Sequence, residues 1–450
     1  MRKLLFLPML FFVLCATTNL SAQSYYGVIE EGPTVLIMSA QRLNPSSAGC
    51  AVCRSVAHSE DTADDVRDLF KSTLRQGFRQ ASNPQFIFSS RNGNFALAIG
   101  GFVNLRTSYD MKGAVLGMDF RPYYIPLTAT YANRQRIMMD ATTSRLFTKA
   151  VVKSPTLGNV LVYVDMDFRG GAEFSYTPRL RSAYVQMLGF TAGRDITTFC
   201  DLMACPTTVD FEGPNAYNFE FATLIRYEGK CFDDRVSYGV AAEMPVVTGT
   251  YDKNFAPISQ RVPDFPMYVQ FAWGKNRQSH FRASAVLRNM YLHNVVNNSN
   301  TSLFGWGVQA SGRVAIGDVI KIFYNGVYGK GVARYIQDLV SSGLDFTPNP
   351  ENNMQIQTMP MWGLQASMQV NIIPSTLAVT GGYSVVKVER ENGFYSLDQY
   401  RRGTYIFGNI FLNLTQNCRL AVEYLHGARK DMSGMKGTAN RLSLMAQYNF

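Results

Sequence analysis

From Asn94 to Phe450 the chain consists of segments of roughly ten residues in which apolar and polar positions alternate. The last segment shows the pattern most clearly. One of its faces carries Leu442, Leu444, Ala446, Tyr448 and Phe450, and the other carries Ser443, Met445, Gln447 and Asn449. Successive side chains of a strand point to opposite faces of a sheet. The alternation therefore predicts strands with one face against lipid and the other against water.

The alternation recurs in sixteen segments, so we predict an all-β fold over residues 94–450, an antiparallel transmembrane β-barrel of sixteen strands. The predicted strands cover residues 94–108, 144–152, 159–168, 179–187, 189–198, 216–229, 235–245, 266–274, 280–294, 301–315, 318–332, 354–372, 376–390, 401–416, 419–431 and 440–450. Tight periplasmic turns are expected at 154–159, 229–233, 317–318, 373–375 and 417–418. Long external loops are expected at 110–143, 195–216, 246–265, 333–353 and 389–400.

The amino terminus has the organisation of a secretory signal peptide, predicted over residues 1–22. A basic start precedes an apolar run from Leu4 to Leu14 that is too short to span a bilayer, and small residues lead up to Ala22. The bulky Leu14 in front of Cys15 argues against the alternative, a lipoprotein signal. We therefore expect export, cleavage after Ala22 and a periplasmic segment over residues 23–93.

Residues 60–78 predict a short helix within this periplasmic segment. Thr62 and Asp65 have the spacing of a capping box. One apolar stripe repeats every four residues and consists of Val66, Phe70, Leu74 and Phe78. The sequence leaves two interpretations open: the helix packs on another part of this chain, or it is a short oligomerising helix.

Composition narrows the class of protein. Charged residues make up 17% of the chain, below the roughly 25% of a soluble globular protein, although 46% of the residues are apolar. No apolar run after Ala22 reaches the roughly 18 residues of a transmembrane helix. These values argue against a soluble α/β enzyme, a helical transporter and a disordered protein, and they favour the barrel.

Six of the seven cysteines follow the signal peptide, and an exported chain permits disulfide bonds. The spacing of Cys50 and Cys53 favours a local disulfide over a redox motif or a metal site. The connection at 195–216 follows the fifth predicted strand, and that connection commonly folds into the lumen of sixteen-stranded porins. The spacing of Cys200 and Cys205 allows a disulfide bond that would make this loop rigid. The alternative is that the two thiols are free or separately paired.

Five stretches in and around this loop form a recognisable pattern: Arg179–Val185, Ala192–Arg194, Thr197–Asp201, Pro206–Pro214 and Ile225–Tyr227. Together they resemble the DcaP-type outer-membrane porins. The resemblance implies a sixteen-stranded trimer that passes small anionic solutes such as dicarboxylates, with an amino-terminal helical segment that forms the trimer. The chain departs from the family pattern in three features: Arg194 stands where members usually carry Gln, the cysteine pair is additional, and the helix is short.

Alternation also predicts where arginine side chains point. Arg226, Arg282, Arg288 and Arg313 alternate with apolar residues, whereas both faces are mixed around Arg179 and Arg181. An arginine facing lipid costs roughly 2–4 kcal/mol, so we expect these side chains in the lumen, where they favour anions. Alternatively, they pair with loop carboxylates and only hold the loop. The predicted constriction set is Arg179, Arg181, Arg194, Asp201, Asp210, Glu212, Arg226, Arg282, Arg288 and Arg313.

We therefore expect a porin in the outer membrane of a Gram-negative bacterium, which admits small, preferably anionic solutes through a lumen narrowed by the loop at 195–216. Catalysis, a cofactor, a metal and nucleic-acid binding are not expected, since the four histidines lie in no serine-hydrolase elbow and no HExxH spacing.

The expected partners are outer-membrane lipid, two further copies of the chain in a homotrimer, and the barrel assembly machinery. The terminal-strand residues Tyr448 and Phe450 resemble the signal that this machinery recognises. Two alternatives remain. One is a structural or adhesive barrel with a plugged lumen and partner-binding loops. The other is a long-chain-lipid transporter, against which the inward arginines argue.

Overall fold

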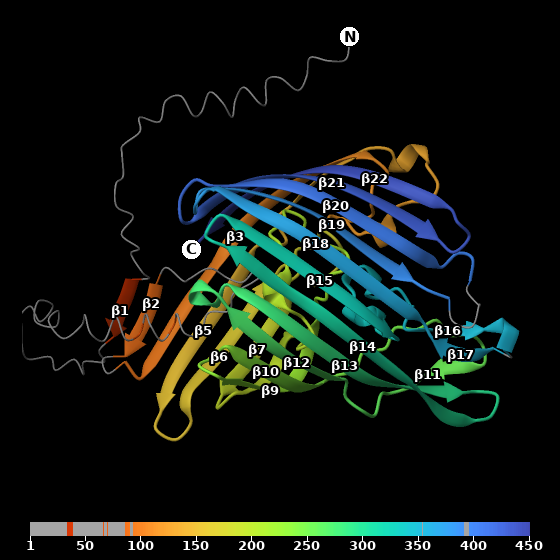
Figure 1. The fold of residues 1–450 in the computed structure, drawn as a ribbon, viewed down its shortest axis with the longest axis horizontal. Coiled ribbons are helices and arrows are strands. Elements are labelled where there is room, and N and C mark those ends of the chain that lie inside the picture. Colours follow the sequence, from red (N-terminus) through yellow and green to blue (C-terminus); the bar gives the residue numbers. More distant parts are fainter. Residues whose placement is uncertain are drawn as a thin grey trace, which may run out of the picture.

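The computed structural model describes residues 34–38, 66, 70, 86–90, 93–352, 354–390 and 396–450. Sixteen of its strands form one closed antiparallel barrel in which the last strand pairs with the first (Figure 1). These strands are β3 (Phe95–Lys112), β5 (Arg145–Ser154), β6 (Gly158–Asp167), β7 (Arg179–Met187), β8 (Phe190–Ile196), β9 (Phe221–Cys231), β10 (Val236–Glu243), β12 (Phe265–Trp273), β13 (Ser279–Asn294), β14 (Ser299–Ile316), β15 (Ile320–Lys330), β18 (Pro360–Ile373), β19 (Leu377–Val388), β20 (Tyr400–Asn413), β21 (Cys418–Asp431) and β22 (Lys436–Asn449).

The remaining described elements are short. The strands are β1 (Thr34–Met38), β2 (Phe86–Ser90), β4 (Arg136–Asp140), β11 (Phe255–Pro257), β16 (Phe346–Asn349) and β17 (Gln355–Thr358). The 3-10 helices are η2 (Pro122–Tyr124), η3 (Tyr131–Asn133), η4 (Leu202–Ala204), η5 (Lys275–Arg277), η6 (Ala333–Tyr335), η7 (Gln337–Leu339) and η8 (Pro350–Asn352). Among the residues that the structure describes, no helix is long and apolar enough to cross a membrane.

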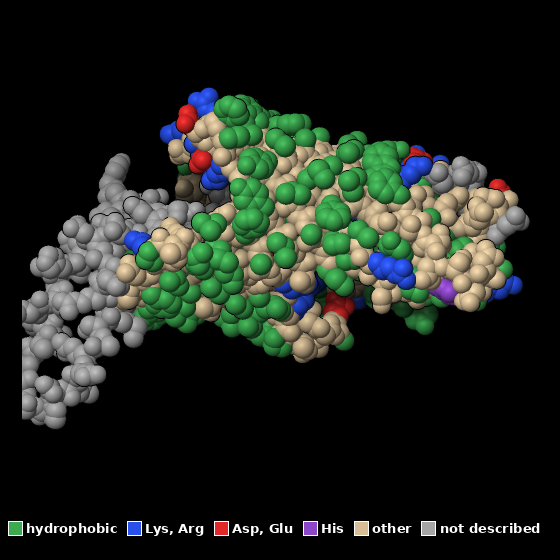
Figure 2. Space-filling view, turned by 90° about the horizontal axis from the view of Figure 1, so that it is seen from below, with side chains coloured by type: hydrophobic (Ala, Val, Ile, Leu, Met, Phe, Trp, Pro, Cys, Tyr) green, Lys and Arg blue, Asp and Glu red, His purple; other side chains and the backbone are tan. Residues whose placement is uncertain are grey.

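The prediction of sixteen alternating strands is confirmed. In β3 the outward side chains Ile99 and Val103 are more than half exposed, whereas the inward Arg106 and Asp110 are buried. Apolar side chains spread over the outer surface of the strands (Figure 2). This surface is the one that lipid covers in a transmembrane barrel.

Two strands begin later than predicted, because residues before them belong to loops that enter the barrel. The strand predicted from 216 begins at Phe221, and the one predicted from 354 begins at Pro360. Short and long connections alternate as expected, except that the connections at 295–298 and 432–435 on the long-loop side are only four residues long. The carboxyl terminus lies at the short-turn end, and β11, β16 and β17 lie at the opposite, long-loop end (Figure 1).

Little of the predicted amino-terminal region can be compared with the structure. The signal peptide, the Cys50–Cys53 pair and most of the predicted helix at 60–78 lie outside the described residues. Val66 and Phe70 are helical and fully buried against inner-face side chains of the first barrel strands, such as Ala96 and Val151. These two contacts favour a helix that packs on its own chain.

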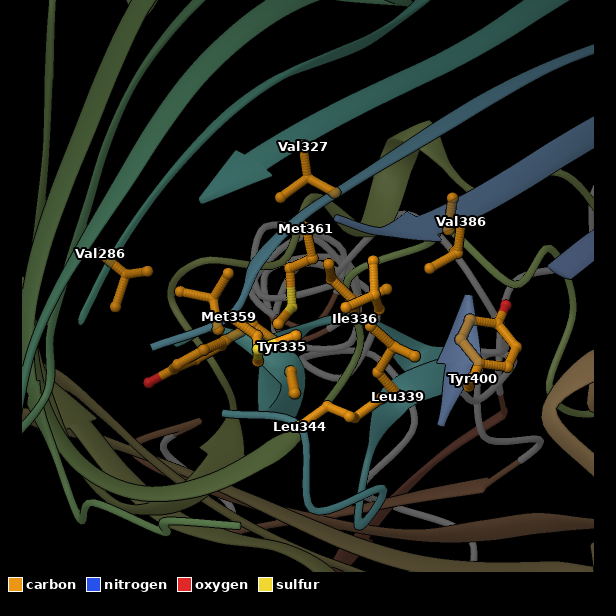
Figure 3. Packing of buried hydrophobic residues seen from close by; sticks show 14 of the residues in the cluster. Val286, Val327, Tyr335, Ile336, Leu339, Leu344, Met359, Met361, Val386 and Tyr400 are labelled. Atoms are coloured by element: carbon orange, nitrogen blue, oxygen red, sulfur yellow. The ribbon is translucent and has the colours of Figure 1, made fainter. Parts of the chain in front are cut away.

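The long-loop end of the lumen is filled by a second inward loop, which the sequence analysis placed outside. Residues 331–359 connect β15 to β18, and their apolar side chains pack with those of the barrel wall in one buried cluster (Figure 3). Tyr335, Ile336 and Leu339 have no exposed surface. The loop was predicted to be external because its sequence carries no strand alternation, although its apolar residues require burial.

Candidate functional site

The loop after the fifth barrel strand, residues 197–220, crosses the lumen and is held on several walls. At its start the Asp201 carboxylate lies 2.8 Å from His280 Nε2 on β13 and accepts a 2.7 Å hydrogen bond from Ser311 on β14. Burial disfavours the charged carboxylate, but these hydrogen bonds and the Arg282 charge outweigh burial and hold the pKa of Asp201 at about 2. Asp201 is thus an anchor for the loop and not a titrating group at neutral pH.

The tip of this inward loop is held by a carboxylate that the sequence analysis did not select. Glu423 on β21 is fully buried and accepts hydrogen bonds from the backbone N–H groups of Val209 (2.9 Å) and Asp210 (2.7 Å). The side-chain amide of Asn409 donates both to Glu423 and to the carbonyl of Thr207. Backbone groups bonded in this way fix the path of the loop tip against the wall.

Three of the predicted constriction arginines hold loops and strands together. Arg226 is 2.8 Å from an Asp195 oxygen, and Arg282 donates to the Thr198 carbonyl and lies over the Tyr268 ring. Arg288 bonds both Asp264 (3.1 Å) and Asp345 (3.0 Å). Asp345 belongs to the second inward loop. For Arg226 and Arg288 the geometry supports the alternative in which arginines pair with carboxylates and hold the fold, whereas Arg282 bonds a carbonyl of the inward loop.

Arg179 and Arg181 also face carboxylates. Both bond Asp167, at 2.6 and 2.8 Å, and Arg181 lies 3.5 Å from Asp165. A β-bulge explains the mixed faces of this segment, because Arg181 is the extra residue that β6 leaves unmatched.

Arg194 was predicted to line the constriction, and the structure places it elsewhere. Its cross-strand partners Ala183 and Thr223 lie on the outer face, as does the neighbouring Ile225, which is 63% exposed. The Arg194 guanidinium donates to the Leu180 carbonyl and packs near the Phe221 ring. The prediction was wrong because alternation along β8 turns Gly193 inward and Arg194 outward.

The remaining predicted carboxylates lie near the loop tip. Asp210 accepts hydrogen bonds from the Phe120 N–H and the Tyr405 hydroxyl, and burial raises its pKa. Glu212 lies 3.3 Å from Arg121. Burial raises the pKa of Glu212 to about 8, with Arg121 opposing the shift and the Asp119 carboxylate adding to it. At neutral pH Glu212 is therefore mainly protonated and adds little negative charge.

Two cavities lie on either side of this loop. The one toward the long-loop end has a volume of about 420 Å³ and contains both signs of charge, including Asp119, Asp140 and Arg169. The one toward the short turns has a volume of about 290 Å³ and is lined by Arg313, Lys321 and Arg419.

At the short-turn end, all the charged residues in the described lining of the cavity are basic. Its described lining residues include no Asp or Glu. The Arg313 guanidinium donates to the Gln278 carbonyl and the Arg419 guanidinium to the Asn413 amide oxygen, both 2.8 Å away. None of the ion pairs between described residues involves Arg313, Lys321 or Arg419. These residues bring three positive charges to the cavity, and the carboxylate of Asp318 lines an adjoining space together with Lys321 and Arg419.

Sequence reasoning selected Arg313 and missed its two companions. Lys321 has the same parity as the buried Phe323, and Arg419 has the same parity as the buried Glu423. The alternation of β15 and β21 therefore already indicated that the side chains of Lys321 and Arg419 point into the lumen. Across the described residues, no group of three or more His, Cys, Asp or Glu side chains is placed to hold a metal ion.

The predicted disulfide between Cys200 and Cys205 is absent: both residues carry thiols. Cys200 Sγ lies 3.3 Å from the Tyr217 hydroxyl in a buried apolar cluster, and burial raises the pKa of the thiol to about 12. The loop is held by packing and by hydrogen bonds to the wall, so a covalent staple is not needed to fix it.

We expect both thiols to be alkylated when the protein is unfolded in denaturant with iodoacetamide and no reductant. Peptide mass spectrometry checks the result, because each alkylated cysteine gains one carbamidomethyl group. Unmodified Cys200 and Cys205 in the same peptide, alkylated only after reduction, would restore the predicted disulfide.

Comparisons with known proteins agree with this architecture. The family model described as DcaP outer membrane protein matches residues 76–450. The crystal structure of the outer membrane channel DcaP of Acinetobacter baumannii superposes with a TM-score of 0.69 at 19% identity, covering 81% of this chain and 99% of that one. OmpT, an outer membrane protein of Vibrio cholerae, gives a TM-score of 0.50 at 11% identity, covering 79% and 98%. No curated protein matches the sequence significantly.

Proposed function

The chain belongs to the DcaP outer membrane protein family, and from this premise we propose that it is a passive porin that prefers small anionic solutes of the carboxylate type. It is a sixteen-stranded barrel of the Gram-negative outer membrane. Sixteen strands leave room for an aqueous lumen, which the inward loop at 197–220 narrows. A passive pore of this kind requires neither a catalytic residue nor a cofactor.

The observation that carries the anion preference is the cavity lined by Arg313, Lys321 and Arg419. Among the other predicted arginines, carboxylate partners compensate the charge of four, namely Arg179, Arg181, Arg226 and Arg288. A cavity whose charged lining residues are all basic raises the local concentration of anions and lowers that of cations. We therefore place the charge selection of the pore in this cavity, on the short-turn side of the inward loop.

Membership of the DcaP outer membrane protein family also bears on the oligomeric state of the protein and on its insertion in the membrane. We propose a homotrimer in outer-membrane lipid, as the resemblance to the family implied. Tyr448 lies on the outer face of β22, and the Phe450 backbone pairs with Gly101 on β3, so the terminal strand closes the barrel. A role of Tyr448 and Phe450 in recognition by the assembly machinery is part of this proposal.

The charge assignment is tested by replacing Arg313, Lys321 and Arg419 together with Gln. We expect the anion-to-cation permeability ratio to fall at least several-fold, because the three substitutions remove all three positive charges from the cavity. The ratio is measured from the reversal potential of the purified protein in a planar bilayer under a potassium chloride gradient.

The matched control for the triple variant is Lys436→Gln, which removes an exposed charge at the long-loop end of β22. This substitution should leave the permeability ratio unchanged. Equal ratios for the triple variant and the wild type would remove these residues from the selectivity filter.

A plugged, partner-binding barrel is the second candidate, and one observation favours it. The loops at 113–144 and 331–359 both pack buried apolar side chains at the long-loop end of the lumen. Such a barrel would carry no ionic current even when it is correctly folded and inserted. Its long loops would then be the binding surface.

A further inference from the structure

The two cavities that flank the inward loop meet at one side chain. Among the lining residues that the structure describes, Phe211 alone borders both the 420 Å³ cavity at the long-loop end and the 290 Å³ cavity at the short-turn end. Phe211 follows Asp210 at the tip of the loop and is partly buried. Its ring therefore stands between the two spaces that a solute must cross in the proposed pore.

The ring of Phe211 is surrounded by arginines. The guanidinium carbons of Arg169, Arg181 and Arg106 lie 4.5, 5.4 and 5.8 Å from its centre. Cations at such distances from an aromatic face are attracted to it. These contacts favour the position of the ring between the cavities without fixing it covalently or by hydrogen bonds.

Each of these arginines is already paired with a carboxylate. Arg169 and Arg106 both reach Asp119, Arg106 also bonds Asp140 at 2.9 Å, and Arg181 bonds Asp167 at 2.8 Å. The charge around the ring is therefore largely balanced. This surrounding differs from that of Arg313, Lys321 and Arg419 in the adjacent cavity, where positive charge is not balanced by lining carboxylates.

The backbone on both sides of Phe211 is fixed. Asp210 N–H donates to Glu423, and the Asp210 carboxylate accepts from Gly213 N–H at 3.2 Å. The Glu212 carbonyl accepts a 2.6 Å hydrogen bond from the side-chain amide of Gln337. A loop held in this way cannot move aside without breaking buried hydrogen bonds, whereas the phenyl ring can rotate about its own side-chain bonds.

We propose that Phe211 is the size-selecting partition of the pore and that it acts separately from the charge-selecting cavity. The inference rests on the proposed porin function. The ring sets the largest solute that crosses the loop, because it occupies the space between the cavities and its surroundings carry balanced charge. Arg313, Lys321 and Arg419 set the sign of the solute. Small anionic solutes pass when the ring rotates, and wider ones are retained at the long-loop end.

The test compares Phe211→Ala with Phe211→Leu and with the matched control Phe174→Ala. Phe174 borders only the long-loop cavity, from a side chain that is 41% exposed. Two quantities are measured for each variant: single-channel conductance with reversal potential in a potassium chloride gradient, and the swelling rate of liposomes in neutral sugars of increasing size.

We expect Phe211→Ala to raise the conductance at least twofold and to admit larger sugars, with Phe211→Leu intermediate and Phe174→Ala like the wild type. The reversal potential should stay that of the wild type. The proposal is overturned if Phe211→Ala leaves conductance and sugar size unchanged, if Phe174→Ala has the same effect, or if the reversal potential moves as far as in the triple Gln variant.

Failure of the porin function itself gives a different result. If the wild type carries no current but the Phe211→Ala variant does, the result contradicts the proposal that the wild type is an open porin. The same result supports the proposal that Phe211 closes the passage between the two cavities. Absence of current from both folded proteins would contradict both. Folding of every variant is checked by its heat-dependent migration on a gel, so a misfolded variant is recognised before conductance is compared.

Discussion

Replacing Arg288 with Met is expected to lower the free energy of unfolding by about 3–5 kcal/mol, because it leaves two buried carboxylates without their main cationic partner. Arg288 is fully buried and bonds Asp264, Asp345 and the carbonyls of Gly331 and Val246. These contacts tie β13 to the second inward loop and to the neighbouring long connection. The unfolding free energy is measured by denaturant titration of the detergent-solubilised protein.

The control for this variant is Arg277→Met, an exposed arginine that pairs with Asp234 in the short turns. Exposed ion pairs contribute roughly 0–1 kcal/mol, so the control should unfold nearly like the wild type. If Arg288→Met were no less stable than Arg277→Met, the buried network would not be what holds the second inward loop in the lumen.

Replacing Glu423 with Ala is expected to release the tip of the inward loop and to make the single-channel current noisy, with excursions to several-fold higher conductance. The substitution leaves the N–H groups of Val209 and Asp210 without their acceptor, at a cost of about 1–3 kcal/mol for each buried group. A tenfold change in an equilibrium needs about 1.4 kcal/mol, so the released tip becomes appreciably populated.

Single-channel recording checks this prediction, with Glu351→Ala as the control, since that carboxylate lies exposed in the external part of the 331–359 loop. The control should give the steady current of the wild type. A quiet Glu423→Ala channel of unchanged conductance would mean that packing alone holds the loop tip.

The strand order was predictable from the sequence because lipid and water impose a strict period of two on the side chains. The pattern of Leu442, Leu444 and Ala446 is visible without any knowledge of neighbouring strands, and the same holds for the inward Arg226 and Arg313. Arg194 was assigned to the constriction from its place in the family pattern, whereas the alternation along β8 turns this side chain to the outer face.

The interior was less predictable because its contacts join residues far apart in the chain. The hydrogen bond from Asp210 N–H to the Glu423 carboxylate joins residues that are 213 positions apart in the chain. No local sequence pattern indicates that these two residues are partners. The apolar residues of the 331–359 loop have no strand period, so their burial in the lumen follows only from the closed barrel. The thiols of Cys200 and Cys205 show likewise that sequence spacing permits a disulfide without requiring one.

The charge of the partly closed lumen also depends on pairing that only the structure displays. Arg181 and Arg313 both point inward. The carboxylates of Asp165 and Asp167 compensate the charge of Arg181, whereas the described lining of the cavity that contains Arg313 has no carboxylate. Counting inward arginines therefore overestimates the basic surface. It also misses Lys321, which contributes to that surface without being an arginine.

The reversal potential of the wild-type protein in a planar bilayer, under a potassium chloride gradient, decides whether the pore prefers anions. We expect a potential at which chloride permeates more readily than potassium, because Arg313, Lys321 and Arg419 bring positive charge to the lumen outside any ion pair between described residues. A potential of the opposite sign, or none from folded and inserted protein, would contradict it.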